Sequence, residues 1–289
     1  MAASTYVPKG LGWISRFYQR RGLAVARSVE SLGFVLSFIW QVLSSIPSTL
    51  KHYRDETLRI ISDMTWGRGS VIVGGGTVPM MIVLGLVMGM SVAVESFTML
   101  NMLGMGPVTG IVSAYATTRE LAPIAAAIGF AAQAGCRITA EIGSMRISEE
   151  IDALEAMGLR SVPFVVTTRV IAGAISIVPT FLIGLILAYL SCRGLITLVH
   201  GQSAGVYDHY FFQFVAGFDV IAAVIKVAIF ATVVILIHSY YGFFATGGPE
   251  GVGIASGRAV RASSVAIVGI DMVLTILLWG FNATISFTG

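Results

Sequence analysis

Charged side chains are scarce in this sequence, so those that interrupt its apolar stretches are the first candidates for chemistry. Charged residues make up only 11% of the 289 residues, whereas hydrophobic residues make up 56%. The charges inside long apolar stretches include four such candidates: Arg119, Glu120, Lys226 and Asp271. A charge surrounded by hydrocarbon is costly unless it is paired or hydrated, so these residues mark ion pairs, ion pathways or polar cavity walls.

The spacing of the four charges limits how they can pair. Adjacent residues of a helix point about 100° apart, so Arg119 and Glu120 are not expected to pair with each other. Pro123 follows closely and is expected to loosen the helix that carries them. Lys226 and Asp271 lie in successive apolar stretches and could pair between two helices. Whether these charges only fix helix packing or line a functional polar cavity stays open.

A second concentration of charge is the run AEIGSMRISEEIDALEAMG, which spans Ala140–Gly158. Ser148 is a good N-cap, and Glu149 and Glu150 would then lie in the first turn, where the helix dipole favours acidic residues. Gly158 suits the position just beyond the C-terminus. The predicted helix has about ten residues, and so short a helix is unstable alone in water. Neighbouring segments or a partner must therefore hold it.

The helical wheel of this run separates acidic from apolar residues. One stripe is acidic and comprises Glu149, Asp152 and Glu155; the stripe beside it is apolar and comprises Ile147, Ile151, Leu154 and Met157. An acidic helix is poorly suited to an anionic membrane surface. A protein partner with a basic rim and an apolar groove suits both stripes better, and a solvated helix resting on the bilayer is the alternative.

The apolar stretches around these charges predict the elements that position them. Five stretches are long enough for transmembrane helices: Gly69–Val94, Val108–Ala134, Val162–Leu190, Phe218–His238 and Ala262–Phe287. They predict an all-α integral membrane protein with five transmembrane helices. Gly85 and Gly89 are spaced for close helix contact, which we interpret as packing within the subunit.

The region before the first predicted span has a different character. Leu32–Ile46 is apolar but short, and we interpret it as a helix in the membrane interface. The hydrophobic region of a signal peptide is the alternative. Residues 51–66 are charged and amphipathic and predict a surface helix. Residues 1–68 are therefore predicted to form a cytoplasmic or interfacial helical region, and residues 69–289 the membrane domain.

The distribution of arginine and lysine predicts an orientation. These residues are concentrated in the N-terminal region and in the loops after the second and fourth spans, and they are sparse in the other two loops. Because cytoplasmic loops carry an excess of positive charge, the N-terminus is predicted to be cytoplasmic and the C-terminus external. The acidic run 140–158 is then cytoplasmic.

The sequence lacks the patterns of several other functional classes. No Walker A motif is present, so the chain is not expected to hydrolyse ATP. The segment GGPEGVG lacks the required lysine, and we interpret it as a glycine-rich turn. The two cysteines and four histidines are too scattered for a disulfide framework or a metal site. The sequence has no basic patch interleaved with aromatic residues, so nucleic-acid binding is not expected. No catalytic residues are expected either.

Three segments of the chain resemble a known family. RELAPIAAAIGFAAQAGCRITAEIGSMRISEEIDALEAMG (Arg119–Gly158) looks like the signature of the MlaE/YrbE family, the permease subunits of MCE-type lipid ABC transporters. GGPEGVG (Gly247–Gly253) and ASSVAIVGIDMVLTILLWG (Ala262–Gly280) also match the family pattern. The resemblance runs from about residue 50 to the C-terminus. GGPEGVG and the EExDALxxxG form look most like the YrbE permeases of mycobacterial-type Mce systems.

The resemblance implies a role for the acidic helix, at about residues 147–158. It would be the coupling helix that docks into a cytoplasmic ATPase. The residues carried over to that role are Glu149, Glu150, Asp152, Ala153, Leu154 and Gly158, and the two stripes add Glu155 and Met157. Arg137 and Glu141, near the cytoplasmic end of the second span, are expected to anchor the junction with this helix.

The resemblance also implies partners and a location. It implies a multi-pass permease of the inner (plasma) membrane that pairs with a second permease, with a heterodimer favoured. A cytoplasmic ABC ATPase dimer would bind ATP and Mg, external MCE-domain proteins would pass on the lipid, and this chain would hold no cofactor. Arg119, Glu120, Lys226 and Asp271 would then line the lipid pathway or only fix packing. Two rivals stay open: an ion-coupled secondary transporter and a non-transporting membrane scaffold.

Overall fold

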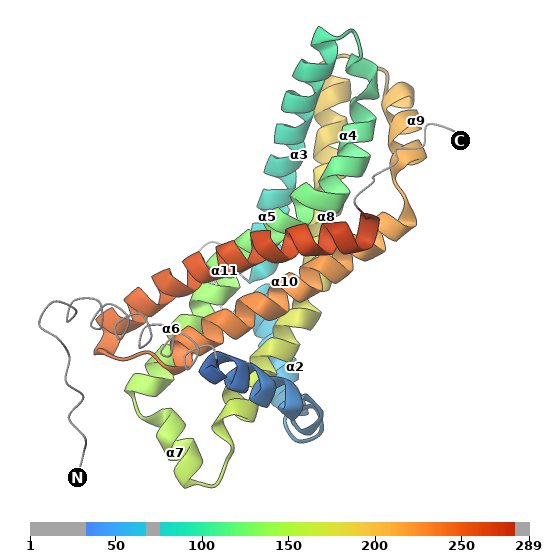
Figure 1. The fold of residues 1–289 in the computed structure, drawn as a ribbon. Helices are drawn as coiled ribbons and strands as arrows, with labels where there is room; N and C mark the ends of the chain where they lie inside the picture. The colour runs from blue at the N-terminus through green and yellow to red at the C-terminus, as the bar shows by residue number, and fades with distance from the viewer. Residues whose placement is uncertain (1–32, 68–75, 281–289) are drawn as a thin grey trace, which may run out of the picture. The chain divides into compact units, whose positions relative to one another are not determined.

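The computed structural model describes residues 33–67 and 76–280, and every regular element within these ranges is helical (Figure 1). The predicted all-α fold class is confirmed. The chain divides into two compact units, residues 1–44 and 45–289. In the first unit the structure describes the beginning of the helix Gly33–His52. The second unit carries the other helices and both predicted sites.

The second unit is a succession of long helices interrupted by single turns of other types. Its α-helices are α2 (Arg54–Trp66), α3 (Thr77–Met102), α4 (Thr109–Ala116), α5 (Ala122–Phe130), α6 (Cys136–Ile147), α7 (Glu150–Ala156), α8 (Thr168–Leu198), α9 (Ala204–Phe214), α10 (Gly217–Phe243) and α11 (Gly248–Trp279). The 3₁₀ turn η1 (Gly106–Val108) precedes α4. Two π-helical turns, η2 (Thr117–Leu121) and η3 (Ala131–Gly135), interrupt the helical column Gly106–Ile147, and a third, η4 (Val162–Thr167), begins the column Val162–Leu198.

Six helical segments within the described residues are long and apolar enough to cross a membrane. They are Gly33–His52, Thr77–Met102, Gly106–Ile147, Val162–Leu198, Gly217–Phe243 and Gly248–Trp279. The last five match the five predicted spans. The first was predicted to be a short interfacial helix over residues 32–46, but it extends for 20 residues, which is sufficient for a span by length and composition.

The boundaries of the first and last predicted spans differ from the structure. α3 begins at Thr77 rather than at residue 69, and residues 68–75 lie outside the described part of the chain. α11 begins at Gly248 rather than at residue 262. Pro249 suits the first helical turn because it needs no backbone donor there, so the predicted glycine-rich turn is reduced to Gly247 and Gly248, both at positive φ.

The glycines of α3 explain its closest packing contact. α3 packs along α8. A Cβ atom at Gly85 would lie 2.2 Å from the carbonyl oxygen of Gly184, and one at Gly89 would lie 2.1 Å from that of Ala188. Only glycine allows the two backbones to approach this closely. The interpretation of these glycines as a packing face within the subunit is confirmed.

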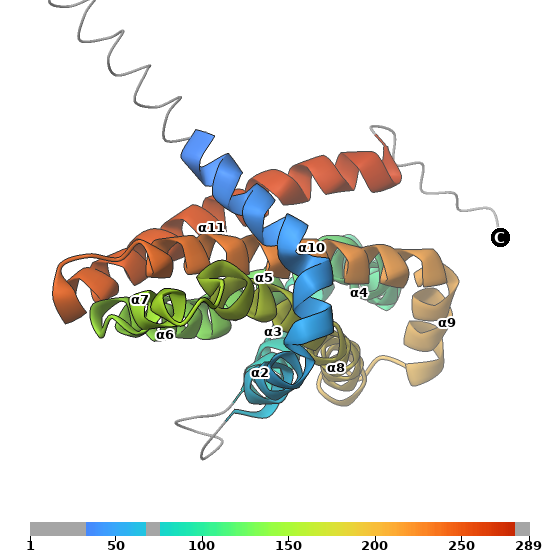
Figure 2. The same ribbon diagram turned by 90° about the horizontal axis from the view of Figure 1, so that it is seen from below.

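The remaining helices position the predicted sites. α10 packs against α11, α8 and α6, and Figures 1 and 2 show α10 and α11 running side by side. The segment from α4 through η2, α5 and η3 to α6 forms one continuous helical column, Gly106–Ile147. α7 lies at the end of this column, and α9 lies at the opposite end of the unit (Figure 1).

Candidate functional site

A buried lysine on α10 lies at the centre of one candidate site. Lys226 is 0% exposed. Its Nζ atom donates to the backbone carbonyl of Arg119 at 2.8 Å and to Thr275 Oγ1 at 2.9 Å. The same atom lies 2.7 Å from Asp271 Oδ1 and 3.3 Å from Glu120 Oε2. The ion pair predicted between Lys226 and Asp271 is therefore present, and Glu120 shares the lysine.

The backbone of η2 explains why a lysine is needed here. In an α-helix the carbonyl of Arg119 would accept from the N–H of residue 123, but Pro123 has no N–H. A buried carbonyl without a donor is costly, and the ammonium of Lys226 supplies one. The π-helical turn Thr117–Leu121 directly before α5 is the loosening predicted from Pro123.

The side chain of Arg119 points to different partners from those of Glu120, as predicted. Its Nε atom lies 2.9 Å from Asp219 Oδ2, and its Nη1 donates to the hydroxyl of Tyr115 at 2.5 Å. Its guanidinium lies over the ring of Tyr115, 3.8 Å from the centroid, and 5.1 Å from that of Trp279. Trp279 Nε1 donates to Asp219 Oδ1 at 2.9 Å. Arg119 is therefore paired, hydrogen-bonded and stacked.

These contacts bring five charged residues together between η2, α10 and α11. We call them the core charge cluster: Arg119, Glu120, Asp219, Lys226 and Asp271. Each ion pair within it joins residues that are far apart in the sequence, so the cluster fixes η2 against α10 and α11. The side chain of Glu120 is 35% exposed, whereas those of its partners Lys226 and Asp271 are nearly or fully buried. Glu120 is therefore the member best placed to respond to a ligand or an ion.

Sequence reasoning missed Tyr115, Asp219, Thr275 and Trp279. Asp219 lies in the first turn of the fourth span and was overlooked beside the more central lysine. Thr275 and Trp279 follow Asp271 at spacings of four and eight residues, so they share its helical face. That spacing was the signal that could have found them.

The second candidate site is α7, where the predicted cap is wrong. Ser148 was expected to cap the helix, but it ends α6 instead, and its hydroxyl donates to the carbonyl of Ser144 at 2.9 Å. α7 has seven residues and begins after Glu149. Glu149 has φ 59° and is the one non-glycine residue at positive φ within residues 33–67 and 76–280. This left-handed turn reverses the chain between the two helices, at a cost of about 1–2 kcal/mol.

The C-terminus of α7 matches the prediction. Gly158 adopts φ 79° just beyond the helix. Its N–H donates to the carbonyl of Glu155 at 2.9 Å, and the N–H of Leu159 donates to that of Leu154 at 3.0 Å. This pair of bonds is the Schellman motif, which ends a helix in a defined direction.

The acidic stripe of α7 has partners within the chain itself. Asp152 Oδ1 lies 2.6 Å from Arg146 Nη1, and Glu155 accepts from the hydroxyl of Ser161 at 2.5 Å. Glu150, another residue expected to take part in coupling, accepts from Ser148 at 3.0 Å. A basic partner surface would therefore meet carboxylates that are already partly compensated.

The apolar stripe of α7 does not form one continuous docking surface. Ile151 is 1% exposed, so it is part of the interior of the unit. Met157 is 67% exposed, Leu154 is half-buried and Ala153 is exposed. The stripe therefore divides: Ile151 holds α7 in place, whereas Leu154 and Met157, with the neighbouring Ala153, are open to solvent in part or in full.

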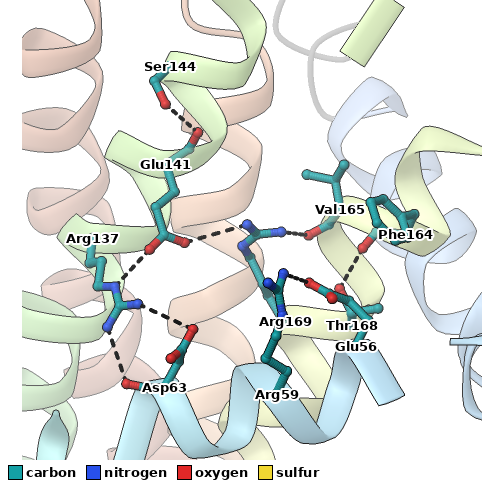
Figure 3. Close-up of polar contacts among 10 residues, drawn as sticks. All are labelled: Glu56, Arg59, Asp63, Arg137, Glu141, Ser144, Phe164, Val165, Thr168 and Arg169. Carbon is teal, nitrogen blue, oxygen red and sulfur yellow. Dashed lines mark hydrogen bonds and ion pairs between the residues drawn. The ribbon is translucent and has the colours of Figure 1, made fainter. Parts of the chain in front are cut away.

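Arg137 and Glu141, the predicted anchor pair, join three helices (Figure 3). Arg137 Nε donates to Glu141 Oε1 at 2.7 Å, and its Nη1 donates to the carbonyl of Asp63 on α2 at 3.2 Å. Arg169 on α8 donates to Glu141 Oε2 at 3.5 Å. This geometry suits a junction that holds α6 two turns before α7, although its role as an anchor stays a prediction.

The described residues offer no other obvious chemistry. Within residues 33–67 and 76–280, no group of three or more His, Cys, Asp or Glu residues is placed to hold a metal ion. Both cysteines, Cys136 and Cys192, are free thiols. The charges of the two sites are used for pairing between and within helices.

Comparison with known proteins places this arrangement in a family. A sequence profile described as Permease MlaE matches residues 67–277, well over half of the chain. The chain belongs to the MlaE permease family. The predicted MlaE/YrbE resemblance is thereby confirmed, and the finer likeness to mycobacterial-type YrbE permeases stays a prediction.

Individual relatives of this MlaE-family chain come from bacteria and plants. A "Probable ABC transporter permease protein" of Rickettsia bellii is 30% identical over 200 residues, which cover 66% of this chain and 74% of that protein. The "Intermembrane phospholipid transport system permease protein MlaE" of Haemophilus influenzae is 30% identical over 201 residues, 68% and 76% of the two chains. The chloroplastic protein TRIGALACTOSYLDIACYLGLYCEROL 1 of Arabidopsis thaliana is 30% identical over 187 residues, 65% and 53%.

Proposed function

We propose that this chain is the permease subunit of an ATP-driven lipid transporter. The observation that carries the proposal is the family match over residues 67–277, which include α7 and all five residues of the core charge cluster. One relative is named a phospholipid transport permease, and several are named ABC transporter permeases. A subunit of this kind moves lipid and leaves ATP hydrolysis to a separate chain.

In this proposal α7 is the coupling helix that receives the motion of the ATPase. Ala153, Leu154 and Met157 face outward and would enter the groove of the ATPase, whereas Ile151 fastens α7 to the unit. α7 follows directly on the helical column Gly106–Ile147. Movement of α7 would therefore travel along that column to the core charge cluster.

The π-helical turns of the column give this movement a place to act. π turns are strained insertions that occur frequently at functional sites. η2 carries Arg119 and Glu120, so a small change in its hydrogen bonding would move both charges relative to Lys226. The core charge cluster would in this way act as a latch on the lipid pathway.

The partners and the location follow from the same proposal. The chain would pair with a second permease, with a heterodimer favoured, and would dock two ATPase subunits that bind ATP and Mg. External MCE-domain proteins would exchange lipid with the permease pair. The chain would lie in the inner (plasma) membrane with its N-terminus in the cytoplasm, in keeping with the arginine and lysine bias of its loops.

The test is ATP-dependent lipid movement by the purified complex in liposomes. The double variant Leu154→Asp, Met157→Asp should lose the co-purifying ATPase while still inserting into the membrane. Phe212→Asp is the control, because it places a charge on an apolar residue about as exposed as Met157 at the opposite end of the unit. Reversing Glu149, Asp152 and Glu155 is less informative, since Asp152 and Glu155 have internal partners.

The outcomes separate the proposal from its rivals. Transport that survives removal of the ATPase but stops when an ion gradient is dissipated would favour a secondary transporter. The specific feature that favours this rival is the partly exposed Glu120 beside Lys226 and Asp271. An intact complex that moves no lipid with ATP would indicate a scaffold.

A further inference from the structure

A cavity of about 260 Å³ with charged side chains in its lining lies between α2, the beginning of α3, α6 and α8. Figure 3 shows the charged side chains that surround it, which come from α2, α6 and α8. None of the residues that line the cavity belongs to the core charge cluster. Thr77, which lines it, is the first residue of an apolar span. The cavity therefore lies where a span begins, which in a bilayer would place it near the lipid headgroups.

The lining of the cavity carries equal numbers of positive and negative groups. Three are guanidinium groups and three are carboxylates: Arg59, Arg137, Arg169, Glu56, Asp63 and Glu141. Arg59 pairs with Glu56 at 2.6 Å, and Arg137 lies 3.9 Å from Asp63 Oδ2. A lining with both signs close together suits a ligand that also carries both charges. A purely anionic or purely cationic ligand would face unfavourable charges as well as favourable ones.

The beginning of α3 adds an anion-binding element to the same cavity. α3 has 26 residues, and its N-terminus bears a partial positive charge. No side chain caps it, because the cap residue is Gly76 and a Cβ atom there would lie 2.2 Å from the carbonyl oxygen of Thr65. The Thr77 hydroxyl is buried and has no hydrogen-bond partner within the described residues. Thr77 is 1% exposed and lines the cavity.

We propose that this cavity binds the headgroup of a zwitterionic phospholipid that carries a phosphate and an ammonium group. The phosphate would lie at the N-terminus of α3, where it would accept from Thr77 and from Arg59 or Arg137. The ammonium would lie near Glu56 and Asp63. The volume is below the roughly 300–1,000 Å³ of sites for whole drug-sized ligands, so the cavity holds a headgroup and leaves the acyl chains outside.

The site would be distinct from the lipid pathway through the membrane. It joins α2 and α8 to α6, the helix that leads into α7, so an occupied site would tie the membrane interface to the docking end of the chain. The inference rests on the proposed function in one respect, that the chain works in a phospholipid membrane. Its test measures binding without ATP and does not depend on transport.

The experiment uses the full chain purified in detergent with its co-isolating subunits and stripped of lipid. Binding of dihexanoyl phosphatidylethanolamine is followed by native mass spectrometry. Dihexanoyl phosphatidylglycerol, O-phosphoethanolamine and inorganic phosphate are measured alongside it. We expect saturable binding of phosphatidylethanolamine that exceeds that of the anionic lipid. If free O-phosphoethanolamine or phosphate binds as tightly as the lipid, the ligand is not a membrane lipid and the proposal is overturned. Equal or tighter binding of phosphatidylglycerol would overturn the preference for a zwitterionic headgroup.

The deciding variant is Thr77→Val, which removes one hydroxyl at nearly constant volume. A hydrogen bond to a charged group contributes about 1.5–3 kcal/mol, so binding should weaken about tenfold or more. The thermal midpoint of the lipid-free protein should not fall, because the hydroxyl has no described partner to lose. Arg59→Gln should also weaken binding. The matched control is Thr98→Val on the same helix, whose hydroxyl donates to Val94. Unchanged binding in both Thr77→Val and Arg59→Gln would overturn the proposal.

Discussion

The core charge cluster and α7 use charge in opposite ways. In the cluster, Lys226 is fully buried and its charged partners lie 106 residues before it and 45 residues after it in the sequence. On α7, Asp152 pairs with Arg146 only six residues away, and both side chains are substantially exposed. Buried pairs between distant segments cost much to break, whereas exposed local pairs contribute little. The cluster therefore holds helices together, and α7 must be held by other means.

The other means are apolar packing and backbone geometry. Ile151 fixes α7 to the unit, and the turns at Glu149 and Gly158 set where it begins and ends. Its charges are then available for a partner without much loss of folding stability. The proposed coupling role of α7 would require this difference, because it needs a firm interior and an end whose surface contacts can rearrange.

The largest effect is expected when the centre of the core charge cluster is removed. Lys226→Met leaves Glu120 and Asp271 without their cation and the Arg119 carbonyl without its donor. Breaking a buried pair by removing one partner costs about 3–5 kcal/mol. We expect a loss of this size in the free energy of unfolding, measured in detergent, and a lower yield of folded protein.

Two further variants sharpen this prediction. Lys226→Met combined with Asp271→Met should recover part of the stability, because an apolar pair tolerates burial better than one unpaired charge. The exchange Lys226→Asp with Asp271→Lys keeps the ion pair but cannot donate to Arg119, so folding should recover only partly. Full recovery of folding and transport by the exchange would show that the cluster only fixes packing. If Lys226→Met alone lowers the free energy of unfolding by less than about 1 kcal/mol, the core charge cluster is no stronger than an exposed pair.

The next largest effect is expected at the residue that fastens α7. Ile151→Ala should cost about 2–4 kcal/mol locally, as truncation of a buried isoleucine does. Because α7 is a short terminal element of the unit, hydrogen exchange should increase in residues 147–160 before the membrane spans change. Met157→Ala, at the exposed C-cap residue just after α7, is the control. Equal exchange in the two variants would show that Ile151 does not hold the helix.

The same contrast explains which features could be predicted from sequence. The spans follow from long apolar stretches, and the Lys226–Asp271 pair follows from two opposite charges in successive spans. Arg137 and Glu141 are four residues apart on one helix, so their contact was also within reach. These features depend on local sequence patterns or on the high cost of burying a charge, and both can be recognised in the sequence alone.

Other features depended on contacts that no local pattern contains. The predicted N-cap of α7 was wrong because α6 extends to Ile147 and has Ser148 as its C-cap. Ile151 was placed on the docking surface because periodicity shows that a residue is apolar but not what covers it. The cavity proposed to bind a headgroup could not be predicted, because it depends on the close approach of α2 to Gly76, which only the folded chain displays.

A smaller effect is expected from the exposed pair Arg146–Asp152, which joins α6 to α7. Arg146→Gln and Asp152→Asn should each change the free energy of unfolding by at most about 1 kcal/mol, since exposed pairs contribute little. The difference from the wild type should shrink further in high salt, because salt screens exposed charges. Parallel unfolding measurements at low and high ionic strength test this. A loss as large as that of Lys226→Met would remove the distinction between the two regions.

The smallest effect is expected at the other exposed pair, which joins α8 to α9. Asp208 accepts from Arg193 Nε and Nη2, both at 2.7 Å, and this hydrogen bonding lowers the pKa of the Asp208 carboxyl. A carboxyl with a lowered pKa stabilises the fold above its ordinary pKa of about 4, and the contribution disappears as the pH falls through the folded-state value. The thermal midpoints of wild type and Asp208→Asn should therefore differ slightly at pH 7 and converge in acid. If the difference between the thermal midpoints grows in acid, ionised Asp208 does not stabilise the fold through this pair, and the prediction is wrong.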